Sequence, residues 1–258
     1  MTETLLPNAA VVSILMLTMW AVSVAMKNVA IVDCIWGLGF VLLAWTTWFL
    51  TTTPRTFPIL AVLTTVWGLR LSLFLLWRNW GKPEDYRYRE MRDKHGDRFW
   101  LVSLVTVFGL QGVVMWIVAL PLQTGGWQVI DDSAPVFAAG IMVWLTGLIF
   151  ESVGDWQLAA FRNRPDNQGK VMNRGLWRYT RHPNYFGDFC VWWGLFLVSV
   201  SSGAPFWSAM GPAVMSVLLL RFSGVRLLEK SLTENKPGYA DYMRQTSAFF
   251  PLPPRKTS

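Results

Sequence analysis

Cations and hydrogen-bonding side chains gather in one short segment, immediately before an apolar run that continues through Trp192-Trp193-Gly194. Its charged and polar members are Arg174, Arg178, Arg181, His182, Asn184, Tyr185 and Asp188. Guanidinium groups make strong, charge-assisted hydrogen bonds to phosphate, so several of them together favour an anion. The segment therefore predicts a site at the bilayer surface for a multiply charged ligand or for lipid phosphate.

Carboxylates also lie inside or at the edges of apolar stretches, where an ionisable group is costly and points to function. They are Asp33, Glu151, Asp155 and Asp188. Glu151 and Asp155 stand four residues apart, so on a helix they share one face. The spacing allows two interpretations: a structural ion pair with Arg162 or Arg221, or contact with a ligand.

Asp33 and Arg70 each need a partner if they lie within a membrane. Asp33 follows Lys27 and Asn28, so it is either an interfacial carboxylate that pairs locally or a deeper, desolvated acid. A carboxyl that stays protonated can donate a hydrogen bond to a substrate carbonyl, which is general-acid chemistry. Arg70 cannot lose its proton and needs an anion or a carbonyl, for which Asp33 or a cofactor phosphate would serve.

The composition identifies the elements that must position these residues. The chain is 53% hydrophobic and only 15% charged, which indicates an integral membrane protein. A span needs about 20 apolar residues, and the uncharged runs predict an all-α, polytopic protein with seven transmembrane helices. We expect them near Ala9–Met26, Val29–Leu50, Phe57–Trp77, Phe99–Leu120, Pro135–Phe161, Phe186–Ser201 and Phe206–Phe222, the sixth being short enough to be re-entrant.

The distribution of Lys and Arg predicts the orientation in the membrane. These residues concentrate at 78–98, at 162–181 and from 221 onward, and none lies in 121–133. The positive-inside rule then places the N-terminus outside and the C-terminus in the cytoplasm, which agrees with an odd number of spans. We expect one membrane domain over 1–258 in the bacterial inner membrane, with the first span retained rather than cleaved as a signal peptide.

Several other classes of site are not expected. Cys34 and Cys190 fall within predicted spans and are interpreted as packing residues, so neither a disulfide nor a metal site is predicted. The net charge of +7 is explained by the cytoplasmic connections and needs no nucleic acid. The sequence has no glycine-rich dinucleotide or phosphate loop of the soluble folds and no nucleophile elbow. The charged segment Glu84–Arg98, including His95, is predicted to be a solvated linker.

The motifs of the second half of the chain together resemble a known family. They are Glu151-x-x-x-Asp155, Arg162, Gly175-Leu176-Trp177-x-Tyr179-x-Arg181-His182-Pro183-Asn184-Tyr185-Phe186-Gly187-Asp188, Trp192-Trp193-Gly194 and Pro237-Gly238-Tyr239-x-x-Tyr242. This pattern is similar to that of the steroid 5α-reductase family, in particular its bacterial branch. The similarity is dense from about residue 150 to 254 and sparser before it.

The resemblance implies a seven-helix enzyme that uses NADPH to reduce the C4–C5 double bond of a 3-oxo-Δ4 steroid or a similar enone. It implies a substrate side in 1–120 and a cofactor-binding half in 135–258. The residues it assigns to the cofactor are Arg70, Lys82, Glu151, Asp155, Arg162, Lys170, Tyr179, Arg181, His182, Asn184, Asp188 and Arg221. An acid on the second helix and a tyrosine on the third polarise the enone oxygen in the family; here Asp33 is the nearest acid, and Trp67 stands about where the tyrosine is expected.

Two alternatives remain open at this stage. Isoprenylcysteine carboxyl methyltransferases share the Arg181-His182-Pro183-x-Tyr185 pattern, and that resemblance implies a membrane enzyme that uses S-adenosylmethionine. A non-catalytic protein that grips anionic lipid head groups would carry a similar basic segment. In the reductase reading the partners are a hydrophobic, steroid-like small molecule and membrane lipids, with no obligate protein partner.

Overall fold

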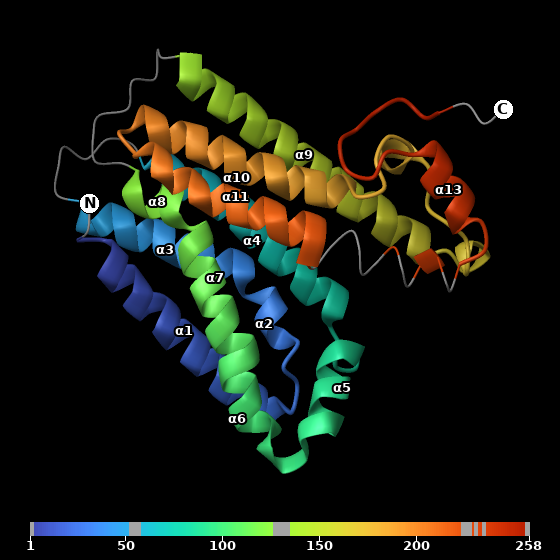
Figure 1. Ribbon diagram of the computed structural model, residues 1–258, viewed down its shortest axis with the longest axis horizontal. Helices are drawn as coiled ribbons and strands as arrows, with labels where there is room; N and C mark the ends of the chain where they lie inside the picture. The colour runs from blue at the N-terminus through green and yellow to red at the C-terminus, as the bar shows by residue number, and fades with distance from the viewer. Residues whose placement is uncertain are drawn as a thin grey trace. The chain divides into compact units, whose positions relative to one another are not determined.

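The computed structural model describes residues 3–51, 58–125, 135–222, 229, 232–233 and 236–255 (Figure 1). Within these residues every regular element is a helix, and the single β-type pairing is an isolated parallel bridge between Thr180 and Ser247. The prediction of an all-α architecture is therefore confirmed. Lipid explains this choice, since a helix satisfies its own backbone hydrogen bonds where no water is present.

The chain divides into two compact units. Unit 1 consists of Met1–Asp132 and Val198–Gly211, and unit 2 consists of Ser133–Leu197 and Pro212–Ser258. The prediction of a single membrane domain stays a prediction.

Unit 1 is built mainly from helices that precede residue 125. They are α1 (Leu5–Met26), α2 (Ile31–Cys34), α3 (Trp36–Leu50), α4 (Ile59–Asn79), α5 (Tyr86–His95), the 3-10 turn η1 (Gly96–Arg98), α6 (Phe99–Ser103), the π-helix η2 (Leu104–Gly109), α7 (Leu110–Val118) and α8 (Leu120–Thr124). The 3-10 turn η5 (Phe206–Ala209), much later in the sequence, also belongs to unit 1. Helices α3 and α4 touch through Gly37 and Gly68: a Cβ added to Gly68 would lie 2.5 Å from the Gly37 carbonyl oxygen. Only glycine permits this approach, which is typical of helix pairs in membranes.

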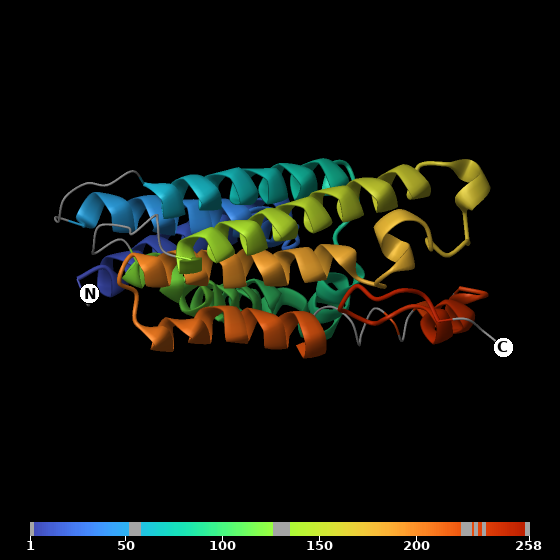
Figure 2. The same cartoon turned by 90° about the horizontal axis from the view of Figure 1, so that it is seen from above.

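Unit 2 contains the long helix α9 and the segments that follow it. Its elements are α9 (Pro135–Arg162), the 3-10 turns η3 (Pro165–Asn167) and η4 (Gly175–Arg178), α10 (Pro183–Ser201), α11 (Met210–Val217), the π-helix η6 (Leu218–Phe222) and α13 (Tyr239–Gln245), with the end of α10 and the start of α11 assigned to unit 1. Helices α9 and α10 run side by side (Figure 2). A Cβ on Gly147 would lie 2.5 Å from the Gly187 carbonyl oxygen, so the two backbones are nearly in contact.

Four described helical stretches are long and apolar enough to cross a membrane: Leu5–Met26, Ile59–Asn79, Tyr86–Val118 and Pro135–Arg162. They correspond to the first, third, fourth and fifth predicted spans. The apolar helices at Trp36–Leu50 and Phe206–Arg221 are shorter, and α10 has 19 residues. A crossing by these three, and the orientation of the termini, stay predictions.

The second predicted span is wrong as a single helix. The stretch Val29–Leu50 breaks at Ile35, with a short turn of helix, α2, before the break and α3 after it. The fourth predicted span starts where α6 begins, at Phe99, while α5 before it is a separate helix that ends at His95, where Gly96 takes a φ of +53°. The break places Asp33 in α2, and both α2 and α5 belong to unit 1.

Candidate functional site

In unit 2 the basic segment is fixed to the last described residues of the chain. The Arg181 amide donates to the Ser247 carbonyl at 2.9 Å, and the Thr180 hydroxyl donates to the Phe249 carbonyl at 2.7 Å. The Leu252 amide donates to the Tyr179 carbonyl at 3.0 Å. Together with the parallel bridge at Thr180, these bonds order the segment 246–252 against residues 179–182.

The Arg181 side chain clamps this arrangement. Its Nε donates to Glu229 Oε1 at 2.7 Å, and its Nη1 donates to the carbonyls of Met243 at 3.1 Å and Thr246 at 2.6 Å. His182 Nε2 lies 3.1 Å from the same Glu229 oxygen. Burial would raise the pKa of Glu229, but the hydrogen bonds from His182 and Arg181 outweigh it and hold that pKa below its ordinary value.

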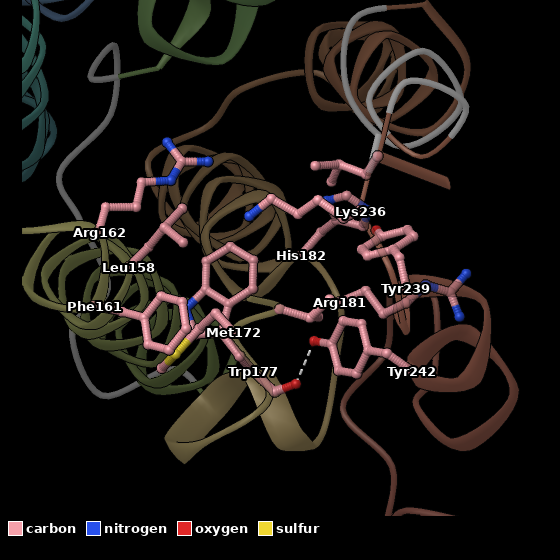
Figure 3. Close-up of a pocket in the computed structure, with 12 residues that line it drawn as sticks. Leu158, Phe161, Arg162, Met172, Trp177, Arg181, His182, Lys236, Tyr239 and Tyr242 are labelled. Atoms are coloured by element: carbon pink, nitrogen blue, oxygen red, sulfur yellow. Dashed lines mark hydrogen bonds between the residues drawn. The ribbon is translucent and has the colours of Figure 1, made fainter. Parts of the chain in front are cut away.

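A small cavity of about 50 Å³ opens beside this clamp (Figure 3). Its walls are Leu158, Phe161, Arg162, Val171, Met172, Trp177, Arg181, His182, Leu232, Lys236, Tyr239 and Tyr242. Tyr242 points its hydroxyl at the main-chain oxygen of Trp177, and the Trp177 indole donates to the Gly154 carbonyl at 3.0 Å. These bonds connect α13, η4 and α9, which come from separate parts of the chain.

The cavity carries like charges on one side. The Arg162 guanidinium and the Lys236 ammonium lie on the same side of it in Figure 3. Burial, and after it the positive charge of Arg162, lowers the pKa of Lys236, whose Nζ donates to the Lys170 carbonyl at 2.9 Å. Burial, and after it the negative charge of Glu229, raises the pKa of Tyr239 to about 12, so its phenol stays protonated at neutral pH. An anion between the two cations would relieve their repulsion.

The acids predicted on α9 are buried as expected for functional groups. Glu151 is 3% and Asp155 is 7% exposed. The Asn184 side-chain amide donates to Asp155 Oδ1 at 3.1 Å, joining α9 to the first turn of α10. The absence of side chains at Gly147 and Gly187 allows this contact, because α9 and α10 approach closely there.

The structure brings some of the predicted cofactor residues together and leaves others apart. Arg162, Arg181 and His182 share the cavity, and Lys170 reaches Lys236 through its carbonyl. Tyr179 and Arg221 are exposed, and Asp188 lies in the second turn of α10. The remaining two, Arg70 and Lys82, belong to unit 1. Their cofactor roles stay predictions.

In unit 1, Asp33 meets a tyrosine that the sequence analysis did not single out. The Tyr88 hydroxyl, on α5, donates to Asp33 Oδ1 at 3.3 Å, and Tyr88 is only 9% exposed. Gln111 Nε2, on α7, donates to the Tyr88 oxygen at 3.3 Å, and Trp36 Nε1 donates to Gln111 Oε1 at 2.6 Å. A carboxylate and a phenol in hydrogen-bond contact can act as a proton donor or acceptor for a ligand.

Helix α5 is held in place by a partly buried ion pair. Glu84 accepts two hydrogen bonds from Arg92, at 2.8 and 3.0 Å, and one from the Val29 amide at 2.7 Å. Burial raises the pKa of Glu84, but the bonds from Arg92 and Val29 bring that pKa below its ordinary value. The prediction that Glu84–Arg98 is a solvated linker is therefore wrong for Tyr88, which α5 carries inward, while Arg87 and Arg89 beside it are exposed.

The second predicted catalytic residue, Trp67, lies in an aromatic row. It is 1% exposed, its ring centroid lies 5.8 Å from that of Phe40, and Phe40 lies 5.8 Å from Trp36. Arg70, one turn further along α4, lies over the Phe74 ring at 5.4 Å. Through Phe40, Trp67 thus supports the indole of Trp36, which donates to Gln111. The predicted contact of Trp67 with a substrate stays a prediction.

Four residues of these sites were missed from the sequence: Tyr88, Gln111, Glu229 and Lys236. Gln111 had a detectable signal, because an amide in the middle of an apolar span seeks a hydrogen-bond partner. The other three stand among charged neighbours, where nothing distinguishes a buried side chain from a solvated one.

Comparisons with known proteins agree with the motifs. A family model described as "Protein of unknown function (DUF1295)" matches residues 19–246, which is most of the chain, and the chain belongs to this family. A human protein named 3-oxo-5-alpha-steroid 4-dehydrogenase 1 is 34% identical over 79 residues, covering 31% of this chain and 28% of the human one. The chain thus spans less than a third of that relative's length, and no solved structure matches.

Two further relatives point in different directions. The protein C594.04c of Schizosaccharomyces pombe, described as uncharacterized, is 24% identical over 275 residues, covering 90% of this chain and 75% of its own. A protein of Ustilaginoidea virens named as a probable O-methyltransferase is 38% identical over 58 residues, covering 22% of this chain and 20% of its own. Over part of its length the chain is thus similar both to a steroid dehydrogenase and to a probable O-methyltransferase.

Proposed function

We propose that this member of the DUF1295 family is a membrane oxidoreductase that reduces the carbon–carbon double bond of a hydrophobic enone with NADPH. The first acceptors to test are 3-oxo-Δ4 steroids, because the human relative of partial length is named for that chemistry. In this proposal unit 2 binds the dinucleotide from the cytoplasm, and unit 1 supplies the acid and the apolar surface for the substrate.

The observation that carries the proposal is the contact between Tyr88 and Asp33. Reduction of an enone places negative charge on its carbonyl oxygen, and a hydrogen-bond donor aimed at that oxygen stabilises the charge as it develops. In the structure the Tyr88 hydroxyl donates to Asp33. In this proposal its hydrogen turns to the substrate carbonyl oxygen, and the carboxyl beside it holds or returns the proton. The resemblance to the steroid 5α-reductase family implies an acid and a tyrosine for this step. In this proposal Tyr88 of α5 takes the place of the tyrosine that α4 lacks.

The residues of the unit 2 cavity fit part of a phosphorylated cofactor. A cavity of about 50 Å³ has room for a single small group, whereas whole-ligand pockets measure about 300–1,000 Å³. Arg162 and Lys236 would hold one phosphate there, and their mutual repulsion is what that anion relieves. When bound, NADPH supplies the hydride for the β-carbon of the enone and leaves as NADP⁺, while the α-carbon takes a proton.

A groove in unit 1 suits the substrate. Its volume is about 600 Å³, and its lining is almost wholly apolar: Ala9, Val12, Ser13, Met16, Leu17, Leu104, Phe108, Gly109, Gly112, Val113 and Trp116. The π-helix Leu104–Gly109 forms part of one wall, and such helices are frequent at functional sites. A flat, apolar molecule entering from lipid would bury its surface against α1 and α7.

The test uses purified protein in detergent with NADPH and progesterone or testosterone. Loss of the nicotinamide absorbance together with a product heavier by two hydrogens is the expected result. NADPH deuterated at C4 should pass one deuterium to the β-carbon. Asp33→Asn should turn over more slowly than wild type at nearly unchanged NADPH affinity, and full turnover by this variant would remove Asp33 from the reaction.

Methyl transfer is the second candidate, favoured by the relative named as a probable O-methyltransferase. Asp33 and Tyr88 would then serve as the base that takes the proton of a hydroxyl acceptor. S-adenosylmethionine carries a sulfonium cation and no phosphate, so it offers no anion to Arg162 and Lys236. Isothermal titration with each cofactor separates the two: heat with S-adenosylmethionine and none with NADPH would replace the reductase proposal.

A further inference from the structure

Four side chains of unit 1 form a hydrogen-bonded chain that extends beyond the Tyr88–Asp33 contact. Trp36 Nε1 lies 2.6 Å from Gln111 Oε1, and Gln111 Nε2 lies 3.3 Å from the Tyr88 oxygen. The Tyr88 oxygen lies 3.3 Å from Asp33 Oδ1. The four residues come from α3, α7, α5 and α2, so the chain exists only in the folded unit.

The indole of Trp36 fixes the direction of the first two bonds of this chain. An indole N–H can only donate, so it must face the oxygen of the Gln111 amide and not its nitrogen. The amide nitrogen therefore faces Tyr88 and donates to the phenol oxygen. With a lone pair of that oxygen occupied, the O–H of Tyr88 is directed at the Asp33 carboxylate. The orientation of the amide thus follows from Trp36 and is not an arbitrary choice.

The aromatic row behind Trp36 keeps this direction fixed. Trp36 packs against Phe40, which packs against the buried Trp67. An indole held in this way cannot easily turn to release Gln111. A hydrogen bond donated to the phenol oxygen also stabilises the negative charge that this oxygen takes when its proton moves away.

We propose that Gln111, oriented by Trp36, is a positioning residue that aims the Tyr88 hydroxyl and strengthens it as a proton donor. The inference rests on the proposed function for the reaction it assists. It assigns Tyr88 and Asp33 to contact with the ligand, and Gln111 and Trp36 to acting through Tyr88. Neither positioning residue needs to touch the substrate.

Three variants separate positioning from packing. Gln111→Leu keeps the volume and removes the bond to Tyr88. Gln111→Glu keeps an acceptor for Trp36, but its carboxylate would draw the Tyr88 O–H away from Asp33. Both should lower kcat about 10- to 100-fold, which is part of the roughly 10²–10⁴-fold rate enhancement that general acid catalysis contributes. The KM for NADPH should stay within about twofold of wild type. Trp36→Phe should give a smaller loss, and Trp20→Phe, which removes the unrelated indole bond to the Trp100 carbonyl, should give none.

A double-mutant cycle with Tyr88→Phe decides whether Gln111 acts through Tyr88. In the Tyr88→Phe background, Gln111→Leu should cost less than about twofold in kcat, because the hydroxyl it orients is gone. Equal losses in both backgrounds would show that Gln111 supports the fold and not Tyr88, and would overturn the inference.

A measurement without turnover keeps the inference separate from the proposed function. Protein labelled with ¹⁵N at the indole nitrogens gives one N–H resonance that disappears in Trp36→Phe. This resonance should move upfield in Gln111→Leu and stay close to its wild-type position in Gln111→Glu. An unmoved signal in Gln111→Leu would refute the chain of bonds, whereas wild-type protein that reduces no enone but shows the shift would refute the reductase proposal alone.

Discussion

The clamp around Arg181 makes a quantitative prediction about the end of the chain. Arg181→Met removes three hydrogen bonds from a side chain that is only 8% exposed, and leaves Glu229 with His182 as its described partner. Removing one partner of a buried pair costs about 3–5 kcal/mol. The lower value applies here, because His182 remains and the Glu229 side chain is 12% exposed.

A cost of about 3 kcal/mol corresponds to about a 150-fold change in the equilibrium between the docked and open C-terminal segment. Hydrogen exchange measures this equilibrium when closing is faster than exchange. The Leu252 amide, which donates to the Tyr179 carbonyl, is the reporter. Peptides that cover 246–255 should exchange about two powers of ten faster in Arg181→Met, and Arg181→Lys should lie between the variant and wild type.

The matched control is Arg178→Met, which removes an exposed guanidinium three residues away and should leave exchange unchanged. NADPH affinity is measured on the same samples. Exchange within twofold of wild type in Arg181→Met would refute the clamp. If NADPH binding were lost in that case, Arg181 would act by direct contact with the cofactor, as the resemblance implies.

Three other predictions follow from the two sites. The pKa of Glu229 is lowered from its ordinary 4.5 in the folded protein, so the stability that Glu229 gives to the docked segment 246–255 is complete above about pH 5 and is lost as the pH falls through the folded pKa. Protection of the amides of 246–255 from hydrogen exchange should therefore weaken on acidification. Glu229→Gln should make that pH dependence flatter, and an identical profile would contradict the assignment. Tyr88→Phe should lower kcat at least about 100-fold with NADPH affinity within twofold, as expected for a general acid, and an unchanged kcat would exclude the phenol. Lys236→Met should weaken NADPH about tenfold and reduce its salt dependence, as loss of a phosphate contact does, whereas Lys94→Met, an exposed cation of α5, should do neither.

Hydropathy predicted the long helices of this protein closely, because lipid imposes their length and composition. Helix α9 was placed at Pro135–Phe161 and is found at Pro135–Arg162. The break at Ile35 was not foreseen, since no proline or charge run marks it in the stretch Val29–Leu50. Hydropathy averaged over a window of residues does not detect a change of backbone angles at a single residue. The break at Ile35 nevertheless decides where Asp33 lies.

The contact between Asp33 and Tyr88 shows a different limit. Asp33 is a candidate because an acid among apolar residues is conspicuous, whereas Tyr88 lies in the charged segment Glu84–Arg98, which the sequence predicts to be a solvated linker. Glu84 binds Arg92 and the Val29 amide, which fixes α5 against the residues just before α2, and the tyrosine then faces Asp33 and Gln111. The burial of Tyr88 thus depends on contacts with other parts of the chain, and no periodicity in the sequence of this segment could have predicted it.

The Arg181-His182 motif shows why donors alone do not reveal their ligand. A guanidinium makes the same kind of bond to a cofactor phosphate and to a carboxylate of its own chain. Here Glu229, 48 residues further along, takes that bond, and two main-chain carbonyls take the next two. Two other cations, Arg162 and Lys236, also line the described cavity wall, and the positive charge of Arg162 contributes to the lowered pKa of Lys236. A motif rich in cations therefore predicts a binding region, while the position of the nearest internal acid decides which cations bind the ligand and which ones build its pocket.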